Sequence, residues 1–180
     1  DTIPKSMTKA DYAEYRFESA LAEEDDFDML VMGRTQGKGC YCYVNGVLKT
    51  LLDKYIGAYR YVVIDNEAGM EHIARGTLPH VDALLLVSDC SRRGVQAVAR
   101  IAEMVLKPGL MKLIINRAPG GVLSDGVREE IEAHHLELAG VLPQDDAVYE
   151  ADCDGKPSSK IPDASPVKQA LHGIMQDLSL

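Results

Sequence analysis

Short, continuous apolar runs recur along the chain at intervals. They cover residues 29–32, 61–64, 83–87, 113–115 and 138–142. Strands buried on both faces have such continuous runs, and they belong to parallel sheets that helices cover. The pattern therefore predicts five buried strands in one mostly parallel sheet.

Helical patterns separate these runs. Apolar residues recur at steps of three and four over residues 44–56, 95–105 and 167–178, which gives each segment one apolar stripe. Another helix is expected near residues 7–24, and the Pro- and Ser-containing segment 153–166 is expected to be a surface loop. Such alternation predicts an α/β fold, with a doubly wound, mostly parallel sheet and helices on both faces, in which residues 1–180 form a single domain.

The loops that follow the five runs are the expected ligand-binding region. In doubly wound sheets, ligands bind beyond the carboxyl ends of the strands. The loops in question are residues 33–39, 65–69, 88–93, 116–121 and 143–146. We expect them to line one edge of the sheet.

Charge and cysteine content narrow the class of protein. The net charge of −9 argues against binding to nucleic acid or to anionic lipid, because both would be repelled. No apolar run is long enough to span a bilayer, and the first residues show no secretory signal. We therefore expect a cytoplasmic protein, where a close pair among Cys40, Cys42, Cys90 and Cys153 would bind metal or be redox-active rather than form a disulfide.

The run at 61–64 is followed by Asp65 and then by Gly69. A carboxylate at the end of a buried strand can orient Mg²⁺ through water, and a glycine N–H can approach a terminal phosphate closely. The alternative is an Asp that caps the next helix, with Gly69 in a turn. The motif alone does not decide between them.

Cys40 and Cys42 form a Cys-x-Cys unit just after Gly37-Lys38-Gly39. Two thiolates supply half of a four-coordinate metal site, and a two-fold dimer axis would bring the other half. The alternative is a pair of buried thiols that act as small hydrophobes. The glycines and Tyr41 favour an exposed loop end, and so favour the metal site.

Asn116 and Arg117 follow the run at 113–115, and Pro143 ends the run at 138–142. An Asn side chain offers a donor and an acceptor, which suits the edge of a purine. Taken alone, an Asn that enters a turn explains the motif better.

Six stretches carry a family resemblance when they are taken together: Gly39–Asn45, Asp65–His72, Arg75–Thr77, Val81–Leu84, Ile115–Arg117 and Gly140–Pro143. In these the chain resembles the CooC family of ATPases, metallochaperones that help insert nickel into carbon monoxide dehydrogenase. That family belongs to the deviant-Walker group of P-loop NTPases, with MinD, ParA and ArsA. The resemblance extends from about Met29 onward.

The resemblance implies specific roles. Cys40 and Cys42 would bind nickel or zinc between two subunits of a homodimer, and the sequence does not choose between these metals. Asp65 and Gly69 would sense the terminal phosphate of ATP, with Mg²⁺ in the complete protein. Asn116 would read adenine, with Arg117 and Pro143 around the base, and carbon monoxide dehydrogenase would be the partner.

One departure from the family is large. No Gly-x-x-x-x-Gly-Lys-Ser/Thr loop occurs in the 180 residues. We expect a fragment that lacks the first strand and the phosphate loop, and that does not hydrolyse ATP alone. That strand would lie between the strands ending at Asp65 and at Ser88.

Three other functions share this fold class. A MinD- or ParA-type positioning ATPase would need a basic or amphipathic membrane-binding tail, or a basic DNA-binding face, and residues 167–180 contain no basic cluster. An iron–sulfur carrier ATPase usually spaces its thiols as Cys-x-x-Cys. A ligase like cobyrinic acid a,c-diamide synthase leaves the Cys-x-Cys unit unexplained.

Overall fold

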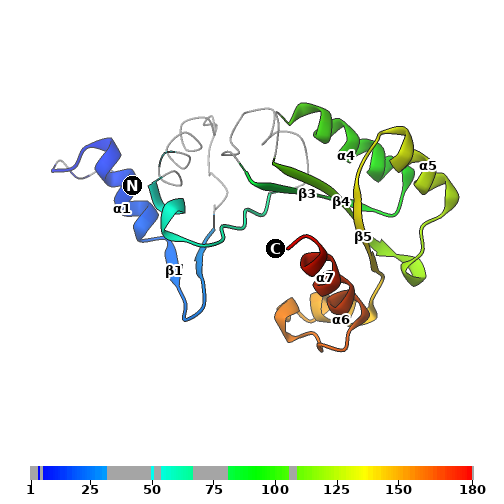
Figure 1. Ribbon diagram of the computed structural model, residues 1–180. Helices are drawn as coiled ribbons and strands as arrows, with labels where there is room; N and C mark the ends of the chain where they lie inside the picture. Colours follow the sequence, from blue (N-terminus) through cyan, green and yellow to red (C-terminus); the bar gives the residue numbers. More distant parts are fainter. Residues whose placement is uncertain are drawn as a thin grey trace. The chain divides into compact units, whose positions relative to one another are not determined.

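A three-stranded parallel sheet organises the second half of the chain in the computed structural model (Figure 1). Its strands are β3 (Ala83–Asp89), β4 (Leu110–Ala118) and β5 (Leu138–Pro143), in the order β3-β4-β5. All pairings are parallel, so the three carboxyl ends meet at one edge. The apolar runs at 83–87, 113–115 and 138–142 thus form the predicted strands.

The structure describes residues 4, 6–31, 50, 54–66, 81–105 and 109–179. The chain divides into two compact units, Asp1–Pro79 and His80–Leu180.

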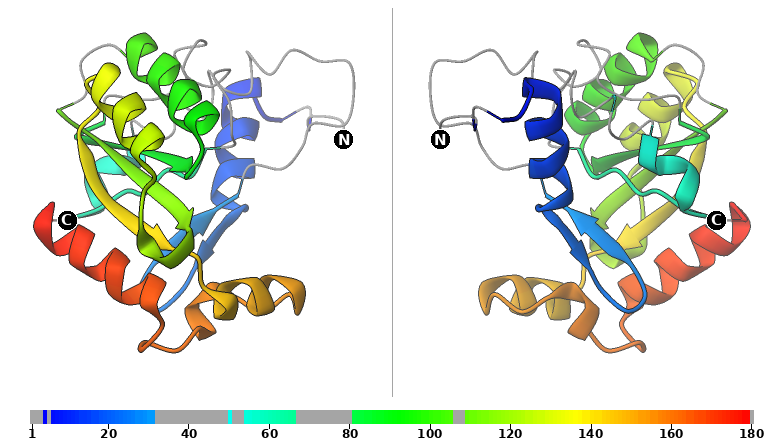
Figure 2. Two further views of the ribbon diagram at one scale, coloured as in Figure 1. Left: turned by 90° about the vertical axis from the view of Figure 1, so that its right-hand side faces the viewer. Right: turned by 90° about the vertical axis from the view of Figure 1, so that its left-hand side faces the viewer.

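Helices cover both faces of the sheet in the second unit (Figure 2). Helices α4 (Arg92–Met104) and α5 (Asp125–Ala133) lie on one face, and α7 (Pro166–Asp177) packs against the other. Strand alternation separates two cores. The first includes Val95, Leu113, Ile115, Val127 and Ile131, and the second includes Ile114, Leu142 and Ile174. The predicted doubly wound α/β arrangement is confirmed.

Helix α7 approaches β5 closely because residue 140 is glycine. A Cβ atom at Gly140 would lie 2.5 Å from the side chain of Ile174, far inside van der Waals contact. Ile174 therefore packs directly on the β5 backbone, which closes the second core.

Three elements in this unit are short. They are the 3₁₀ turns η2 (Pro119–Gly121) and η3 (Ser158–Lys160), and the helix α6 (Asp146–Cys153). The expected loop at 153–166 contains η3 and is anchored, because Ile161 and Ser165 are buried. Its path from α6 to α7 is thus fixed by packing as well as by its prolines.

In the first unit, helix α1 (Lys9–Glu18) is shorter than the helix expected near 7–24. Thr8 and Asp11 form a capping box at its start. After its end, β1 (Leu21–Glu23) pairs with β2 (Asp28–Leu30) in an antiparallel hairpin. A strand is thus present near the predicted run at 29–32, but among the described residues it pairs with β1 and does not join the parallel sheet, because the intervening turn folds β2 back on β1.

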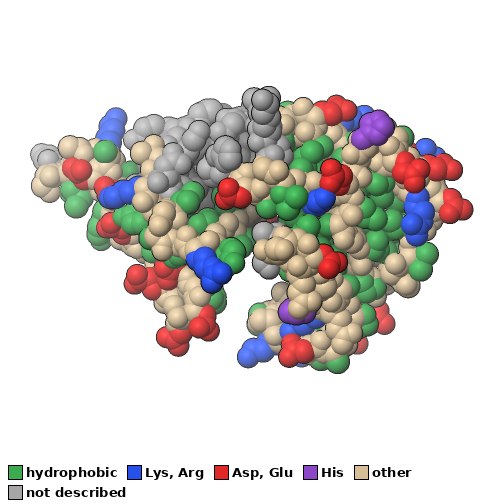
Figure 3. All heavy atoms as spheres, in the orientation of Figure 1, with side chains coloured by type: hydrophobic (Ala, Val, Ile, Leu, Met, Phe, Trp, Pro, Cys, Tyr) green, Lys and Arg blue, Asp and Glu red, His purple; other side chains and the backbone are tan. Residues whose placement is uncertain are grey.

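The hairpin turn carries an acidic surface. Residues 23–26 are all acidic and exposed, and Figure 3 shows their side chains gathered at the tip. Polyanions such as nucleic acid would be repelled from this surface.

Residues 61–66 form no regular structure, so the strand predicted at 61–64 is wrong. Val63 is 92% exposed. A strand is stable when a neighbour satisfies its backbone groups and covers its side chains, and no strand among the described residues pairs with this segment.

The end of the predicted helix at 44–56 packs against α1. Tyr55 stacks on Phe17 with ring centroids 5.2 Å apart, and its hydroxyl donates to Glu18 at 2.6 Å. The chain continues into the 3₁₀ turn η1 (Ile56–Ala58). Most of residues 44–56 lies outside the described residues. No helix within the described part of the chain is long and apolar enough to cross a bilayer.

Candidate functional site

The carboxyl ends of β4 and β5 form one continuous edge. Ala118 and Pro143 are register partners, and the N–H of Gln144 donates to the carbonyl of Ala118 at 2.9 Å. The loop beginning at Asn116 and the loop beginning at Pro143 are therefore neighbours. The structure brings together the three residues expected to bind a nucleotide base, Asn116, Arg117 and Pro143.

The turn at Asn116 and Arg117 has an unusual backbone. Arg117 has φ of 58°, in the left-handed region, which costs a non-glycine residue about 1–2 kcal/mol. Two contacts hold it: the side-chain oxygen of Asn116 accepts from the N–H of Arg117 at 2.9 Å, and the Cys90 thiol donates to the Arg117 carbonyl at 3.5 Å. The side-chain NH₂ of Asn116 has no partner among the described residues, so it remains available as a donor to a ligand.

At the end of β3, a serine links the strand to helix α4. The Ser91 hydroxyl accepts from the N–H of Gly94 at 3.0 Å and donates to the Asp89 carboxylate at 2.6 Å. This hydrogen bond and a second from the Ser91 N–H lower the pKa of Asp89. A Cβ atom at Gly94 would lie 2.3 Å from Asp89 Oδ1, so glycine lets the carboxylate lie over the first turn of α4.

At the end of β5, Asp145 joins two helices. Its side chain accepts from the N–H of Ala147 at 3.0 Å, and so caps α6. It also accepts from the Ser165 hydroxyl at 2.5 Å and from the N–H of Val167 at 3.3 Å, at the start of α7. The Ser165 hydroxyl contributes most to lowering the pKa of Asp145. Sequence reasoning placed Asp145 on the edge but did not find this role.

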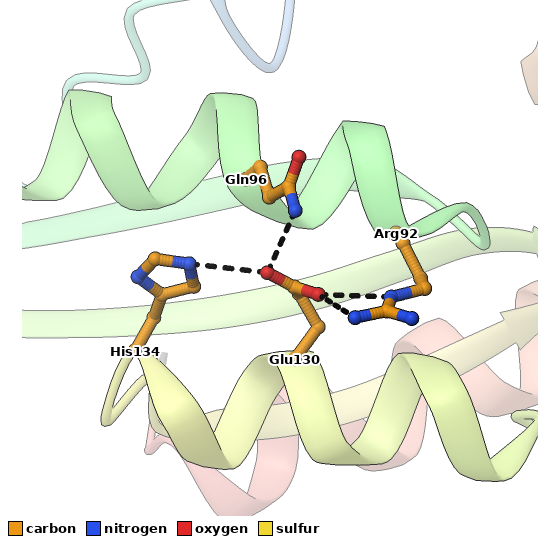
Figure 4. A network of polar contacts seen from close by, with 4 residues as sticks. All are labelled: Arg92, Gln96, Glu130 and His134. Atoms are coloured by element: carbon orange, nitrogen blue, oxygen red, sulfur yellow. Dashed lines mark hydrogen bonds and ion pairs between the residues drawn. The ribbon is translucent and has the colours of Figure 1, made fainter.

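Hydrogen bonds to the buried carboxylate of Glu130 join helices α4 and α5 (Figure 4). Glu130 of α5 accepts from Arg92 Nε at 2.9 Å and Nη2 at 2.8 Å, and from the Gln96 amide at 2.9 Å. His134 Nε2 lies 3.3 Å from the same carboxylate. Gln96, then Arg92, lowers the pKa of Glu130. Because Arg92 is the first residue of α4, this network fixes the start of that helix, and the sequence pattern gave no sign of it.

An open pocket of about 430 Å³ lies at this edge. It is lined by Pro119, Gly120, Gln144, Asp145, Asp146 and Pro166. Its walls come from the loops after β4 and β5 and from the start of α7. A small ligand at the carboxyl edge could therefore contact both loops at once.

The other predicted site residues are not tested by this arrangement. Asp65 is exposed in the first unit, and Gly69, Cys40 and Cys42 lie outside the described residues. The expectation that Asp65 lies beside Asn116 stays a prediction. Across the described ranges, no three His, Cys, Asp or Glu side chains converge as a metal site.

The sequence of this chain is similar to those of known ATP-binding proteins. No protein-family model matches the chain. An uncharacterised ATP-binding protein of Methanocaldococcus jannaschii is 34% identical over 99% of the chain and 72% of its own length. The carbon monoxide dehydrogenase accessory protein CooC of Rhodospirillum rubrum is 32% identical over 71% of the chain, which corresponds to 49% of that protein.

Solved structures show the same fold at lower identity. The septum site-determining protein MinD of Pyrococcus horikoshii, complexed with Mg-ADP, covers 99% of the chain and 74% of its own length, with a TM-score of 0.69 and 16% identity. A ParA family ATPase of Chlorobium tepidum covers 94% of the chain and 72% of its own length, with a TM-score of 0.68 and 17% identity. At these identities the likeness establishes the fold alone.

Proposed function

This chain belongs to the same family as the ATP-binding protein of Methanocaldococcus jannaschii, and we propose that it is the nucleotide-binding part of an ATPase that helps insert nickel into carbon monoxide dehydrogenase. It has the fold of MinD- and ParA-type ATPases. Two functions are proposed for separate parts of the chain: adenine-nucleotide binding at the carboxyl edge, and metal binding at the Cys-x-Cys unit.

The Asn116–Arg117 turn is the observation that carries the proposed nucleotide binding. The turn is held in a left-handed conformation, at an edge it shares with Pro143, and the Asn116 NH₂ has no partner among the residues that the structure describes. An Asn amide at a strand end can donate to, and accept from, the edge of a purine. In this proposal the apolar ring of Pro143 and the side chain of Arg117 would lie around the base.

Phosphate chemistry is proposed for the first unit. Asp65 would orient a water-coordinated Mg²⁺, which would neutralise charge on the phosphates, and the Gly69 N–H would contact the terminal phosphate. Hydrolysis also requires a phosphate-binding loop, and the 180 residues contain none of the expected pattern. The activity therefore belongs to the proposal for the whole protein, of which this chain would provide the base-binding edge.

Metal binding is proposed for Cys40 and Cys42. Two thiolates make a soft ligand set suited to nickel or zinc, and they fill half of a four-coordinate shell. A homodimer would complete the shell with the same pair from a second copy. The support is the ligand chemistry together with the 32% identity to the accessory protein of Rhodospirillum rubrum. In this proposal nickel is the cargo, and carbon monoxide dehydrogenase is the recipient.

Metal titration tests this part of the proposal. Ni²⁺ and Zn²⁺ are titrated into the protein and into a Cys40→Ser, Cys42→Ser variant, with mass measured in solution. We expect one metal per two chains in the unmodified protein and a loss of at least tenfold in affinity in the variant. A Cys90→Ser, Cys153→Ser variant is the matched control and should bind like the original. Equal binding by both double variants, or one metal per monomer, would disprove the paired site.

The runner-up is a MinD- or ParA-type positioning ATPase, which shares the fold. It is disfavoured because such proteins must hold a membrane or DNA, whereas this chain has a net charge of −9 and an acidic hairpin tip. The iron–sulfur carrier and the cobyrinic acid a,c-diamide synthase-like ligase remain less favoured. A coloured iron–sulfur cluster would support the carrier, and binding of neither metal nor cluster would support the ligase.

A further inference from the structure

We propose that Asp145 and Ser165 act as a positioning pair for the base-binding edge, in which the buried Ser165 holds the Asp145 carboxylate and Asp145 holds the loop after β5 where a base requires it. This inference rests on the proposed nucleotide binding. It adds Ser165 to that proposal, a residue 20 positions away from Asp145 in the sequence. The pair acts through the loop and not through contacts of its own with the base.

The loop after β5 is short. Only Gln144 and Asp145 lie between the end of β5 at Pro143 and the start of α6 at Asp146. Gln144 is exposed, and its N–H donates to the carbonyl of Ala118, which joins the loop to the base-binding turn. The side chain of Asp145 restrains the loop from the other side.

Both oxygens of the Asp145 carboxylate accept hydrogen bonds from the fold. One accepts from the N–H of Ala147 at 3.0 Å, in the first turn of α6. The other accepts from the Ser165 hydroxyl at 2.5 Å and from the N–H of Val167 at 3.3 Å. Hydrogen bonds to an ionised group are shorter and stronger than those between neutral groups. The carboxylate therefore joins the loop after β5 to the starts of both α6 and α7.

The Ser165 hydroxyl does not cap the helix that Ser165 precedes. A serine at this position ordinarily accepts a hydrogen bond from a backbone N–H in the first turn of its helix. Among the described residues no such bond forms at Ser165, and its hydroxyl donates to Asp145 instead. Asp145 in turn accepts from Val167, the second residue of α7. The side chain of Ser165 thus restrains the loop after β5, which capping of α7 alone does not require.

Ser165 has a well-defined position because α7 packs on the sheet. Ser165 and Ile174 are each 6% exposed. Ile174 packs on β5 at Gly140, and Val167 packs against the same core. The sheet therefore sets the position of Ser165, and Ser165 sets that of the loop through Asp145. Loss of either side chain lets the loop move while the strands stay in place.

The open pocket lies between the parts that the pair joins. Gln144 and Asp145 line it from the loop after β5, Pro166 lines it from α7, and Pro119 and Gly120 line it from the loop after β4. A ligand that contacts both loops needs them at a fixed separation. Displacement of one loop therefore weakens binding although the ligand loses no contact with the substituted side chain.

A double-mutant cycle tests the pair. The ¹⁵N-labelled chain is titrated with adenosine in the original protein, in Asp145→Ala, in Ser165→Ala and in the double variant. We expect each single substitution to weaken adenosine binding about tenfold, as for a lost hydrogen bond to a charged group. The double variant should bind no more weakly than Asp145→Ala, because Ser165 acts through Asp145. Without ligand, Ser165→Ala should shift the amide signals of Gln144 and Ala147.

Two control variants separate positioning from stability. Ser158→Ala removes an exposed hydroxyl from the same connection between α6 and α7, and it should bind adenosine like the original protein. Ile174→Val removes a methyl group from the contact between α7 and β5, so it should lower the urea midpoint but leave adenosine affinity unchanged. Asp145→Asn, which keeps the shape of the side chain, replaces Asp145→Ala in the cycle if that variant does not fold.

Three results overturn the inference: Ser165→Ala binds adenosine as tightly as the original protein, the effects of the two substitutions add, or Ile174→Val weakens binding as much as Ser165→Ala. An Asn116→Ala variant distinguishes this failure from failure of the proposed function. If Asn116→Ala weakens adenosine binding and Ser165→Ala does not, base binding stands and the positioning pair fails. If the original protein binds no adenosine, the proposed nucleotide binding fails and the inference fails with it.

Discussion

Glu130 is 7% exposed between α4 and α5, and each of its carboxylate oxygens accepts hydrogen bonds. A buried charge is tolerated when it is paired and fully hydrogen-bonded, and Arg92 and Gln96 supply both conditions. Removing the charge leaves the Arg92 guanidinium without its partner. The start of α4, next to the carboxyl edge, is then less firmly held.

We predict that Glu130→Gln lowers the free energy of unfolding at neutral pH. The substitution should also make that free energy depend less on pH in the acid range. The pKa of Glu130 is lowered in the folded state, so its contribution is fully present above the ordinary glutamate pKa of about 4.3. The contribution is lost as pH falls from there through the lowered folded pKa. Urea midpoints measured from pH 7 down to pH 3 should therefore fall less steeply in Glu130→Gln than in the original protein.

Glu129 provides the control for this experiment. It is the exposed neighbour of Glu130 on the same helix, and Glu129→Gln removes the same charge at the surface. Its acid dependence should match that of the original protein. If Glu130→Gln and Glu129→Gln behave alike, Glu130 does not stabilise the junction between α4 and α5.

At the scale of elements, we predict that alanine substitutions at two glycines, one in α7 and one facing it, have opposite effects on stability. Gly140→Ala would place a Cβ 2.5 Å from Ile174, and overpacking of this kind costs about 1–3 kcal/mol. Gly173 lies within α7, where a Cβ would meet nothing within 4 Å, so Gly173→Ala should stabilise by up to about 1 kcal/mol. Thermal or urea unfolding of the two variants measures both. A stabilising Gly140→Ala would show that α7 does not pack on β5 as described.

The apolar pattern predicted some of the strands correctly and others not. The runs that became β3, β4 and β5 are covered by helices on both faces, and a continuous apolar run predicts that environment correctly. The run at 61–64 has the same apolar pattern, but it forms no strand, because no strand among the described residues pairs with it. Residues 28–30 pair locally instead, because the turn after Leu21–Glu23 brings a partner that is close in sequence.

The site was predictable to a similar degree. Asn116, Arg117 and Pro143 could be placed on one edge because the carboxyl ends of parallel strands meet there. The Cys90–Arg117 contact, the triple role of Asp145 and the Glu130 network could not. Each depends on which side chains of separate elements meet, and spacing along one segment does not encode that.

At the scale of the whole molecule, we predict that the 180-residue chain does not turn over ATP. Phosphoryl transfer depends on a loop, a lysine and a held Mg²⁺ that together position and neutralise the phosphates. The sequence contains no such loop. Phosphate release with ATP and Mg²⁺ should equal that of the buffer alone. Turnover above the blank that Asn116→Ala abolishes would reveal a different phosphate site in this chain.

The central proposal for this chain is that the carboxyl edge of β4 and β5 recognises an adenine base. The most direct test is ADP binding to the ¹⁵N-labelled chain, followed through the amide signals of Arg117, Ala118 and Gln144. We predict that ADP shifts these signals, that GDP binds more weakly, and that Asn116→Ala reduces ADP affinity about tenfold, as expected for lost hydrogen bonds to the base. Shifts confined to other parts of the chain, or unchanged affinity in Asn116→Ala, would contradict the claim.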